Sequence, residues 1–382
     1  MSVTLVAAGL AAALAGTNLV SLALSARRLK PYERLPAHAS EPWVSVVIPV
    51  RGVETFSDET IARAFALDYP FYELIFCLQD EGDPIGPRIR RAIAAHPNVS
   101  ARLLVGDDAF CENPKLNNCV KGWDAARHPW IVLADSNVLM PPDYLQQLFA
   151  GWREDTGLVC STPIGSRPQN FWAEVECAFL NTLQARWQYT GESLGMGYAQ
   201  GKSMLWYAPL LEGEGGIRAL SAEIAEDAAA TKLVRRAGRH VHLADTPFEQ
   251  PLGPRSFRQI WSRQIRWARL RRVTFPALYA PEVFIGGLMP AVFAAIAAGS
   301  AGHNPAGIGA AVLALNYLPE VMLAASKGWH VSWTQPIAML IRDFLQPASW
   351  LRGWLPGEIL WHGHSMNIRP KSSEDLETAP IA

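Results

Sequence analysis

Two short motifs in the second half of the chain combine acidic, basic and aromatic side chains in an order suited to group transfer. Glu226-Asp227 sets two carboxylates side by side, and Arg263-Gln264-Ile265-Arg266-Trp267 follows with two guanidinium groups and an indole. A carboxylate acts as a general base toward a hydroxyl nucleophile, and guanidinium groups clamp phosphates. Because an apolar segment begins soon after Trp267, we expect this chemistry beside a membrane, with a charged donor and a lipid acceptor.

Each motif also has a purely structural explanation. The helix macrodipole favours acidic residues in a first helical turn. Arginines mixed with indoles before an apolar segment are typical of an interfacial helix. The functional interpretation takes Asp227 as the general base, Arg266 as a diphosphate clamp and Trp267 as a surface against a sugar or acceptor. It therefore depends on further residues upstream.

Two upstream carboxylates follow predicted strands. Asp80 comes after Glu73–Leu78, and Asp135 comes after Trp130–Ala134. A carboxylate at the end of a buried strand is expected to bind a divalent cation or a hydroxyl-rich ligand, so we assign Asp135 to Mg²⁺ or Mn²⁺ bridging to a diphosphate. A helix cap at Asp80 and a solvated turn at Asp135 are the alternatives.

Three further positions complete the donor side of the predicted site. Lys115 follows Asn113-Pro114 at the start of a predicted helix, where the helix amino end and the ammonium are expected to hold phosphate. Pro49 and Gly52 lie at the end of the first predicted strand, where the backbone is expected to grip a nucleotide base and ribose.

Gly201-Lys202-Ser203 resembles the end of a Walker loop. Met196 stands where the first glycine of that loop is required, which excludes an ATPase of this type. We expect Gly201 instead to let the chain approach the donor or acceptor closely.

The elements that position these residues alternate between strands and helices. This pattern predicts an α/β sheet sandwiched by helices, with ligands beyond the carboxyl ends of the strands. The predicted strands are Val44–Pro49, Glu73–Leu78, Ala101–Val105, Trp130–Ala134 and Gly157–Cys160, and the predicted helices include Thr60–Leu67, Pro87–Ala95, Pro114–Ala126 and Asp143–Arg153.

Composition indicates a membrane component. Of 382 residues, 49 % are hydrophobic and 18 % charged, whereas about 25 % is usual for charged residues in soluble domains. The net charge of −1 provides no basic field for nucleic acid. The five cysteines show no metal-ligand spacing and are interpreted as reduced thiols.

The first apolar run, Val3–Ala26, is long enough to span a bilayer. Arg27, Arg28 and Lys30 follow it, which predicts an amino terminus outside and the rest of the chain in the cytoplasm. A cleaved signal peptide is the alternative, but such peptides carry their positive charge before the apolar run.

Several later segments are predicted to lie in or on the membrane. Asn170–Tyr189 is an aromatic amphipathic helix, either packed in the core or at the membrane surface. Val283–Gly299 and Gly307–Ala325 form a predicted hairpin of spans. Trp333–Leu355 contains Arg342 and Asp343, so a re-entrant or in-plane segment is favoured over a simple span.

These segments divide the chain into five predicted parts. They are an anchor at 1–30, a catalytic domain at 31–254, an interfacial amphipathic helix at 255–280, membrane segments at 281–360 and a flexible cytoplasmic tail at 361–382.

The ordered motifs closely resemble the ceramide glucosyltransferase family, glycosyltransferase family 21, in a bacterial-type member. The likeness runs from about Trp43 to past Arg342 and is carried by Leu78-Gln79-Asp80, Asn113-Pro114-Lys115-Leu116-Asn117-Asn118, Asp135-Ser136-Asn137, Glu226-Asp227 and Arg263-x-x-Arg266-Trp267. The resemblance implies a GT-A fold, a Rossmann-like nucleotide-sugar domain. It also implies UDP-glucose as donor, a divalent cation, and inverting transfer to the primary hydroxyl of ceramide at the cytoplasmic leaflet of a bacterial inner membrane.

Carried over residue by residue, the resemblance places Asp80 and Asp135 at the donor and metal site and makes Asp227 the base. Arg263, Arg266 and Trp267 fill the terminal motif, and Glu226, Gly201 and Trp267 are expected on the acceptor side. Two departures stand out. Asn137 replaces the glycine that usually follows Asp-Ser in the family, and Leu183–Trp187 lacks the histidine of the animal members.

Other functions remain open at this point. A related enzyme would use another UDP-sugar, or a hopanoid or diacylglycerol acceptor. A polysaccharide synthase shares the acid pair and the Arg-Trp ending, but two or three apolar segments are too few for an export channel. A non-catalytic sugar-nucleotide sensor or membrane scaffold is the alternative from a different class.

Overall fold

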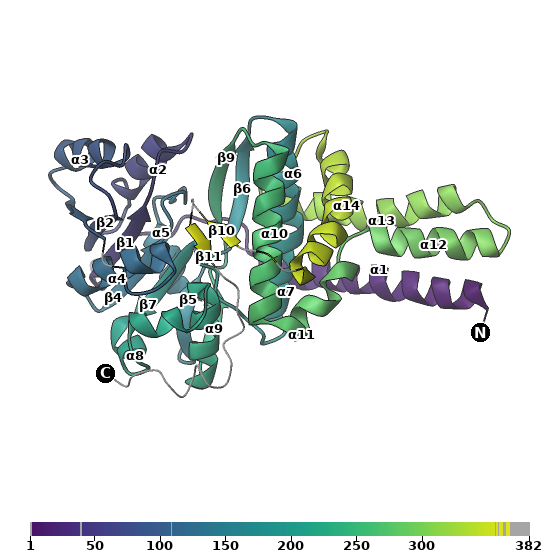
Figure 1. Cartoon of the computed structure of the whole chain (residues 1–382), viewed down its shortest axis with the longest axis horizontal. Coiled ribbons are helices and arrows are strands. Elements are labelled where there is room, and N and C mark those ends of the chain that lie inside the picture. The colour runs from purple at the N-terminus through teal and green to yellow at the C-terminus, as the bar shows by residue number, and fades with distance from the viewer. Residues whose placement is uncertain are drawn as a thin grey trace.

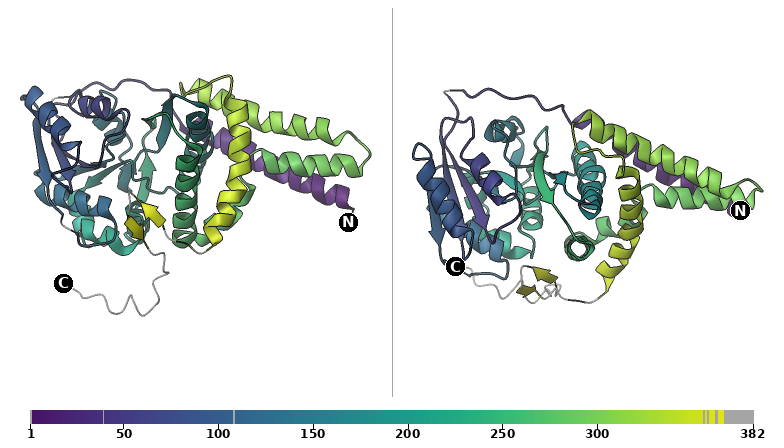
Figure 2. Two further views of the ribbon diagram at one scale, coloured as in Figure 1. Left: turned by 45° about the horizontal axis from the view of Figure 1, so that its top comes forward. Right: turned by 90° about the horizontal axis from the view of Figure 1, so that it is seen from above.

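The computed structural model describes residues 2–38, 40–107, 109–355, 357, 359–361 and 364–366. A sheet with helices on both faces forms one end of the molecule, and apolar helices project from the other (Figure 1). Two long helices, α10 (Phe257–Thr274) and α14 (Gln335–Trp354), stand between these parts and cross the direction of the projecting helices (Figures 1 and 2).

The central sheet has seven strands in the order β3-β2-β1-β4-β7-β5-β8. Most of its residues are apolar and buried, as expected for strands covered on both faces. Strand β7 runs antiparallel to β4 and β5, whereas the other pairs are parallel. The strands are β1 (Val44–Val50), β2 (Tyr72–Leu78), β3 (Ser100–Val105), β4 (Trp130–Ala134), β5 (Thr156–Cys160), β7 (Ser203–Tyr207) and β8 (His240–Leu243).

The five predicted strands are therefore present as β1 to β5, while β7 and β8 were not predicted. Two smaller sheets were also not predicted. They are the parallel pair β6 (Pro163–Pro168) with β9 (Phe248–Gly253) and the antiparallel pair β10 (Ile359–Trp361) with β11 (His364–Met366).

Helices close both faces of the central sheet. Ile61, Ile89 and Tyr144 belong to the core on one face, and Leu116 and Leu233 to the core on the other. The helices concerned are α2 (Ser57–Ala64), α3 (Gly86–Ala95), α4 (Pro114–Ala125), α5 (Tyr144–Ala150), α8 (Ala208–Glu212), η2 (Ile217–Ala222) and α9 (Glu226–Arg236).

A second helical layer lies between the sheet and the projecting helices. The predicted aromatic helix is present as α6 (Phe171–Cys177), the π-helical η1 (Ala178–Ala185) and α7 (Arg186–Ser193). Most of its residues are buried, including Phe179 and Tyr189. The arginine-rich helix is α10 (Phe257–Thr274), which begins with a capping box between Ser256 and Gln259. Two short helices follow, α11 (Pro276–Tyr279) and η3 (Ala280–Phe284).

The projecting helices are α1 (Val3–Arg28), α12 (Leu288–Ser300) and α13 (Pro305–Ser326), which pack against one another. Within the described residues α1 and α13 are long and apolar enough to cross a membrane, and a third span arises if 276–284 and 288–300 count as one bent segment. Helix α14 (Gln335–Trp354) runs across these helices (Figure 2). That direction agrees with an in-plane segment, which stays a prediction because no membrane is present.

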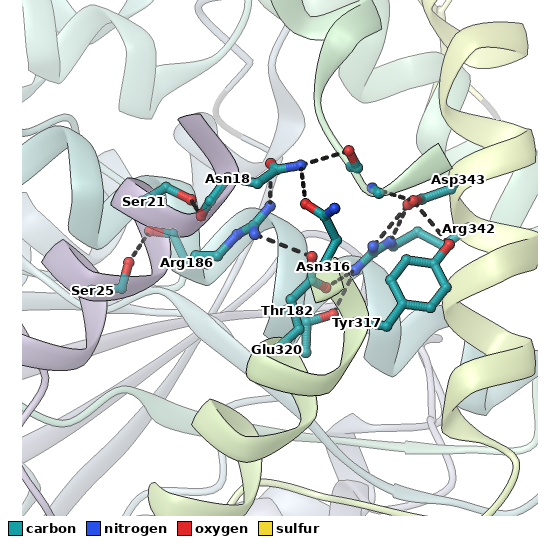
Figure 3. Close-up of polar contacts among 12 residues, drawn as sticks. Asn18, Ser21, Ser25, Thr182, Arg186, Asn316, Tyr317, Glu320, Arg342 and Asp343 are labelled. Carbon is teal, nitrogen blue, oxygen red and sulfur yellow. Dashed lines mark hydrogen bonds and ion pairs between the residues drawn. The ribbon is translucent and has the colours of Figure 1, made fainter. Parts of the chain in front are cut away.

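A buried ionic cluster ties the projecting helices to the second layer (Figure 3). This membrane-side cluster consists of Arg186, Glu320, Arg342 and Asp343, all 3 % exposed or less. Glu320 lies 3.1 Å from Arg186 and 2.8 Å from Arg342, and Arg342 lies 2.7 Å from Asp343. Two arginines and two carboxylates leave no net charge, so the costly charges of α14 are paired within the protein.

Candidate functional site

One large cavity of about 1390 Å³ opens at the carboxyl ends of β1, β2 and β4 and extends along α10 toward η3. Among the predicted site residues it is lined by Pro49, Asp80, Lys115, Asp135, Gly201, Glu226, Asp227, Arg263, Arg266 and Trp267. Residues 218 positions apart in sequence, from Pro49 to Trp267, thus share one space. Gly52 is the exception, since it lines a smaller neighbouring pocket.

Asp135 follows β4 and faces two lysines. Its Oδ1 lies 2.6 Å from the Lys115 Nζ, and its Oδ2 lies 2.8 Å from the Lys202 Nζ. The Lys202 ammonium also donates to the Asn137 Oδ1 at 2.9 Å. Burial alone would raise the pKa of Asp135, but the two ammonium groups outweigh it and lower the pKa to about 2. Asp135 is therefore ionised at any physiological pH.

Lys115 joins three parts of the site. Besides Asp135, its ammonium contacts the Glu226 Oε1 at 2.7 Å and donates to the Gly201 carbonyl at 2.6 Å. An ammonium has three N–H donors, so these contacts use all of them. Lys115 holds the acidic residues together in this arrangement, whereas its phosphate contact stays a prediction.

Asp227 lies in the first turn of α9, beside Glu226. Its Oδ2 accepts a hydrogen bond from the Gly201 N–H at 3.1 Å. Burial, together with the negative charge of Glu226, raises the pKa of Asp227 to about 6. This value suits a general base near neutral pH, because the carboxylate is both available and basic enough to take a proton.

Gly201 permits this close packing because it has no side chain. A Cβ atom there would lie 2.9 Å from the Glu226 Oε1 and 3.0 Å from the Lys115 Nζ. The atoms that crowd Gly201 here belong to the protein, and its expected close approach to a donor or acceptor stays a prediction.

Asp80 follows β2 at the cavity rim, where its Oδ1 accepts a hydrogen bond from the Gly82 N–H at 2.9 Å. Gly52 has a φ of 65°, a conformation that favours glycine. The Gly52 N–H donates to both carboxylate oxygens of Asp83, at 2.8 and 3.1 Å. Asp83 thereby fixes the loop after β1, and the predicted role of Gly52 at a nucleotide is indirect in this geometry.

The two arginines of the terminal motif lie in different surroundings. Arg263 is paired with Glu176 of α6, which is 1 % exposed, and Arg255 approaches the same carboxylate at 3.3 Å. The Arg263 guanidinium lies 5.7 Å from the centre of the Trp267 ring. Arg263 therefore restrains α10 against α6 as well as lining the cavity.

Arg266 and Trp267, the last two residues of the motif, both line the cavity. Burial and the neighbouring Arg263 lower the pKa of Arg266 to about 10, so the guanidinium stays charged at neutral pH. Trp267 packs against an apolar cluster from α6, η1 and β9 that includes Cys177, Leu180 and Leu252. A charged group and a fixed aromatic surface thus lie one residue apart.

The far end of the cavity is more apolar and lies on the side of the projecting helices. Leu270, Phe275, Leu278 and Ile285 line it, and Leu278 is 54 % exposed. The Arg271 Nε contacts both oxygens of Glu282 at 2.9 Å on the same wall. This end has the lining expected for a lipid group, whereas the opposite end carries the charged residues.

Sequence reasoning missed two functional candidates. Lys202 received no role because β7, the strand it precedes, was not recognised. Glu176 lies 87 residues from Arg263, and an acidic residue within an aromatic helix gives no signal of that contact. Both Arg255 and Arg263 contact the Glu176 carboxylate, and only the packing of α6 against α10 reveals this shared contact.

The chain is similar to known proteins over most of its length. The model described as "Glycosyl transferase family 21" matches residues 6–374. Ceramide glucosyltransferase 1 of Caenorhabditis elegans is 24 % identical over 352 residues, covering 89 % of this chain and 76 % of the relative. Ceramide glucosyltransferase 3 of the same organism is 26 % identical over 263 residues, covering 68 % of this chain and 57 % of the relative.

Among solved structures, a mannosyltransferase from Pyrobaculum calidifontis in complex with GDP-Man and Mn²⁺ is similar with a TM-score of 0.47 and 18 % identity. The alignment covers 92 % of this chain and 97 % of that one.

Proposed function

This chain belongs to glycosyl transferase family 21, and from that premise we propose that it transfers glucose from UDP-glucose to the primary hydroxyl of ceramide. The family match and the mixed sheet, with antiparallel β7 between β4 and β5, confirm the expected GT-A fold with apolar helices at both ends. The observation that supports the proposed reaction most directly is the single cavity shared by Asp80, Asp135, Asp227 and Arg266.

The donor belongs at the charged end of this cavity. Open α/β sheets bind ligands beyond the carboxyl ends of their strands, where Pro49, Asp80 and Asp135 lie. We assign the base and ribose to Pro49 and the loop holding Gly52, and the diphosphate to the side of Lys202 and Arg266. Arg266 then stabilises the negative charge that develops on the leaving UDP.

The acceptor enters from the apolar end. Its hydrocarbon chains lie near Leu278 and Ile285, and its hydroxyl reaches Asp227 past Trp267 and Glu226. In an inverting displacement the acceptor oxygen attacks the anomeric carbon opposite the leaving diphosphate, and Asp227 takes the hydroxyl proton. The raised pKa of Asp227 supports this role, since it makes the carboxylate a stronger base.

A divalent cation was expected at Asp135. Both oxygens of that carboxylate contact ammonium groups. The residues as arranged do not fit Mg²⁺ or Mn²⁺, so no step of this mechanism is derived through a cation.

We also propose an integral protein of the bacterial inner membrane with its catalytic domain in the cytoplasm. The candidate spans α1 and α13 support the membrane location. The basic residues at the end of α1, Arg27 and Arg28, and Lys30 just after it support the orientation.

The test is to incubate purified full-length protein with a panel of UDP-sugars and with ceramide, diacylglycerol or a hopanoid, and to identify the lipids formed by mass spectrometry. Glucosylceramide from UDP-glucose is the expected product. A different sugar or lipid in the product would replace the proposed substrates while keeping the reaction class. Absence of any glycolipid, with UDP-sugar left intact, would favour a non-catalytic sensor.

A further inference from the structure

The Lys202 ammonium occupies the position where the sequence led us to expect a divalent cation. It bridges the Asp135 Oδ2 at 2.8 Å and the Asn137 Oδ1 at 2.9 Å. Carboxylate and amide oxygens two residues apart are the kind of ligands that a hard cation takes. Here a side chain of the protein supplies the positive charge to both.

Backbone pairing between β7 and β4 fixes the position of Lys202 beside Asp135. Lys202 immediately precedes β7, whose Ser203 pairs with Ala134 of β4. The Asp135 N–H donates to the Lys202 carbonyl at 2.9 Å. The Ser203 hydroxyl is held in turn by the Tyr144 hydroxyl at 2.8 Å. The antiparallel insertion of β7 therefore fixes the lysine directly opposite the carboxylate.

The two lysines of the site differ in what they offer a ligand. Lys115 contacts three acceptors and uses all its N–H donors. Within the described residues the Lys202 ammonium contacts two acceptor oxygens. Its third N–H can therefore donate to an oxygen of a ligand. Lys202 lines the cavity beside Asp135 and Asn137, and its side chain is 17 % exposed.

We propose that Lys202 takes the place of a divalent cation and binds the diphosphate of the donor directly. A lysine ammonium is a compact point charge that binds phosphate in many proteins. A metal ion at Asp135 would have to displace this ammonium against like-charge repulsion. This inference rests on the proposed function, because it concerns a nucleoside diphosphate donor in the same cavity. Donor binding then needs no added metal.

The test measures UDP binding by isothermal titration calorimetry on full-length protein, in EDTA and with added Mn²⁺. We expect EDTA to change the wild-type affinity by less than about twofold. We expect Lys202→Met to weaken UDP binding in EDTA by about tenfold or more, about 1.4 kcal/mol, with part of the loss recovered on adding Mn²⁺. Lys202→Arg should keep most of the affinity, because it retains the charge.

Lys232→Met is the matched control. Lys232 lies on α9, pairs with the partly buried Glu223 at 2.6 Å and is not among the residues that line the cavity, so its removal should leave UDP affinity unchanged. Electron paramagnetic resonance of Mn²⁺ provides a second readout. Wild-type protein should leave the Mn²⁺ spectrum that of the free ion, and Lys202→Met should broaden it.

Two results would overturn the role of Lys202. One is wild-type protein that loses tenfold or more of its UDP affinity in EDTA and regains it with Mn²⁺. The other is Lys202→Met that binds UDP as wild type does in EDTA. Should Lys202→Met fail to fold, the wild-type EDTA and Mn²⁺ measurements decide the question alone. Wild-type protein that binds UDP in neither buffer would refute the proposed function itself, and this inference with it.

Discussion

The molecule contains two clusters of paired charges that are built for different tasks. The cavity cluster, Lys115, Asp135, Lys202, Glu226 and Asp227, lines an open space and has three carboxylates against two ammonium groups. The membrane-side cluster, Arg186, Glu320, Arg342 and Asp343, is sealed from solvent and balanced in charge.

The two clusters show that charge balance and access to a cavity distinguish a stabilising ionic cluster from a candidate reactive one. A balanced, fully buried cluster satisfies its own charges, and removing one partner leaves another uncompensated. In the cavity cluster, burial and the negative charge of the neighbouring Glu226 instead raise the pKa of one carboxylate, that of Asp227. Perturbed groups of this kind in a cleft are typical of functional sites.

The largest expected effect comes from the cavity cluster. Asp227→Asn should lower the rate of sugar transfer by about 10² to 10⁴, because the general base is lost. UDP affinity should stay nearly unchanged, since the role proposed for Asp227 concerns the acceptor hydroxyl and not the UDP. Lipid product by mass spectrometry and UDP binding by calorimetry measure the two quantities. Equal loss of both would contradict a role confined to proton transfer.

The converse prediction concerns the membrane-side cluster. Glu320→Ala should destabilise the protein by about 3–5 kcal/mol, because two buried arginines lose their shared partner. Thermal unfolding in detergent measures this effect. Asp124→Ala is the control, since its pair with Arg218 is exposed on both sides, and such pairs contribute about 1 kcal/mol or less. Similar unfolding temperatures for the two variants would refute the distinction between the clusters.

The pH dependence of transfer should follow Asp227. Its raised pKa of about 6 means that the base is ionised above this pH and protonated below it. The kcat/KM for the acceptor should therefore level off above about pH 6 and fall about tenfold per unit below it. Asp135, with its lowered pKa of about 2, should contribute no transition in this range. A flat profile between pH 5 and 7 would argue against Asp227 as the base.

The smallest expected effect tests the link between α6 and α10. Glu176→Gln should weaken UDP-sugar binding by about tenfold, about 1.4 kcal/mol, because Arg263 and Arg255 lose the carboxylate that positions them. Glu176→Asp should restore part of the affinity by keeping the charge. An increase in KM with little change in kcat would identify Glu176 as a positioning residue. Unaltered KM in both variants would show that Arg263 does not depend on it.

The shared location of several candidate site residues was predictable because they follow strands. The periodic apolar runs predicted β1, β2 and β4, and with them the positions of Asp80 and Asp135 at one edge of the sheet. The capping residue Asn113 likewise predicted the start of α4, where its side chain accepts from the Lys115 N–H. Local signals were sufficient in each of these cases.

The unpredicted parts all depend on contacts between distant segments. Strand β7 was not recognised, because its place between β4 and β5 is set by pairing and not by its own pattern. Arg342 and Asp343 were correctly singled out as costly in an apolar segment, but their partner Glu320 lies on another helix.

The sequence by itself determined the kinds of chemistry available, the sheet that carries it and the apolar segments beside it, because these follow from residue type and local periodicity. Only the tertiary structure decided which charges meet. It placed two lysines against Asp135, placed the carboxylate of Glu176 against Arg263, and buried Asp227 beside the carboxylate of Glu226. The physical reason is that electrostatic interactions depend on distance and burial, which are fixed when the chain folds.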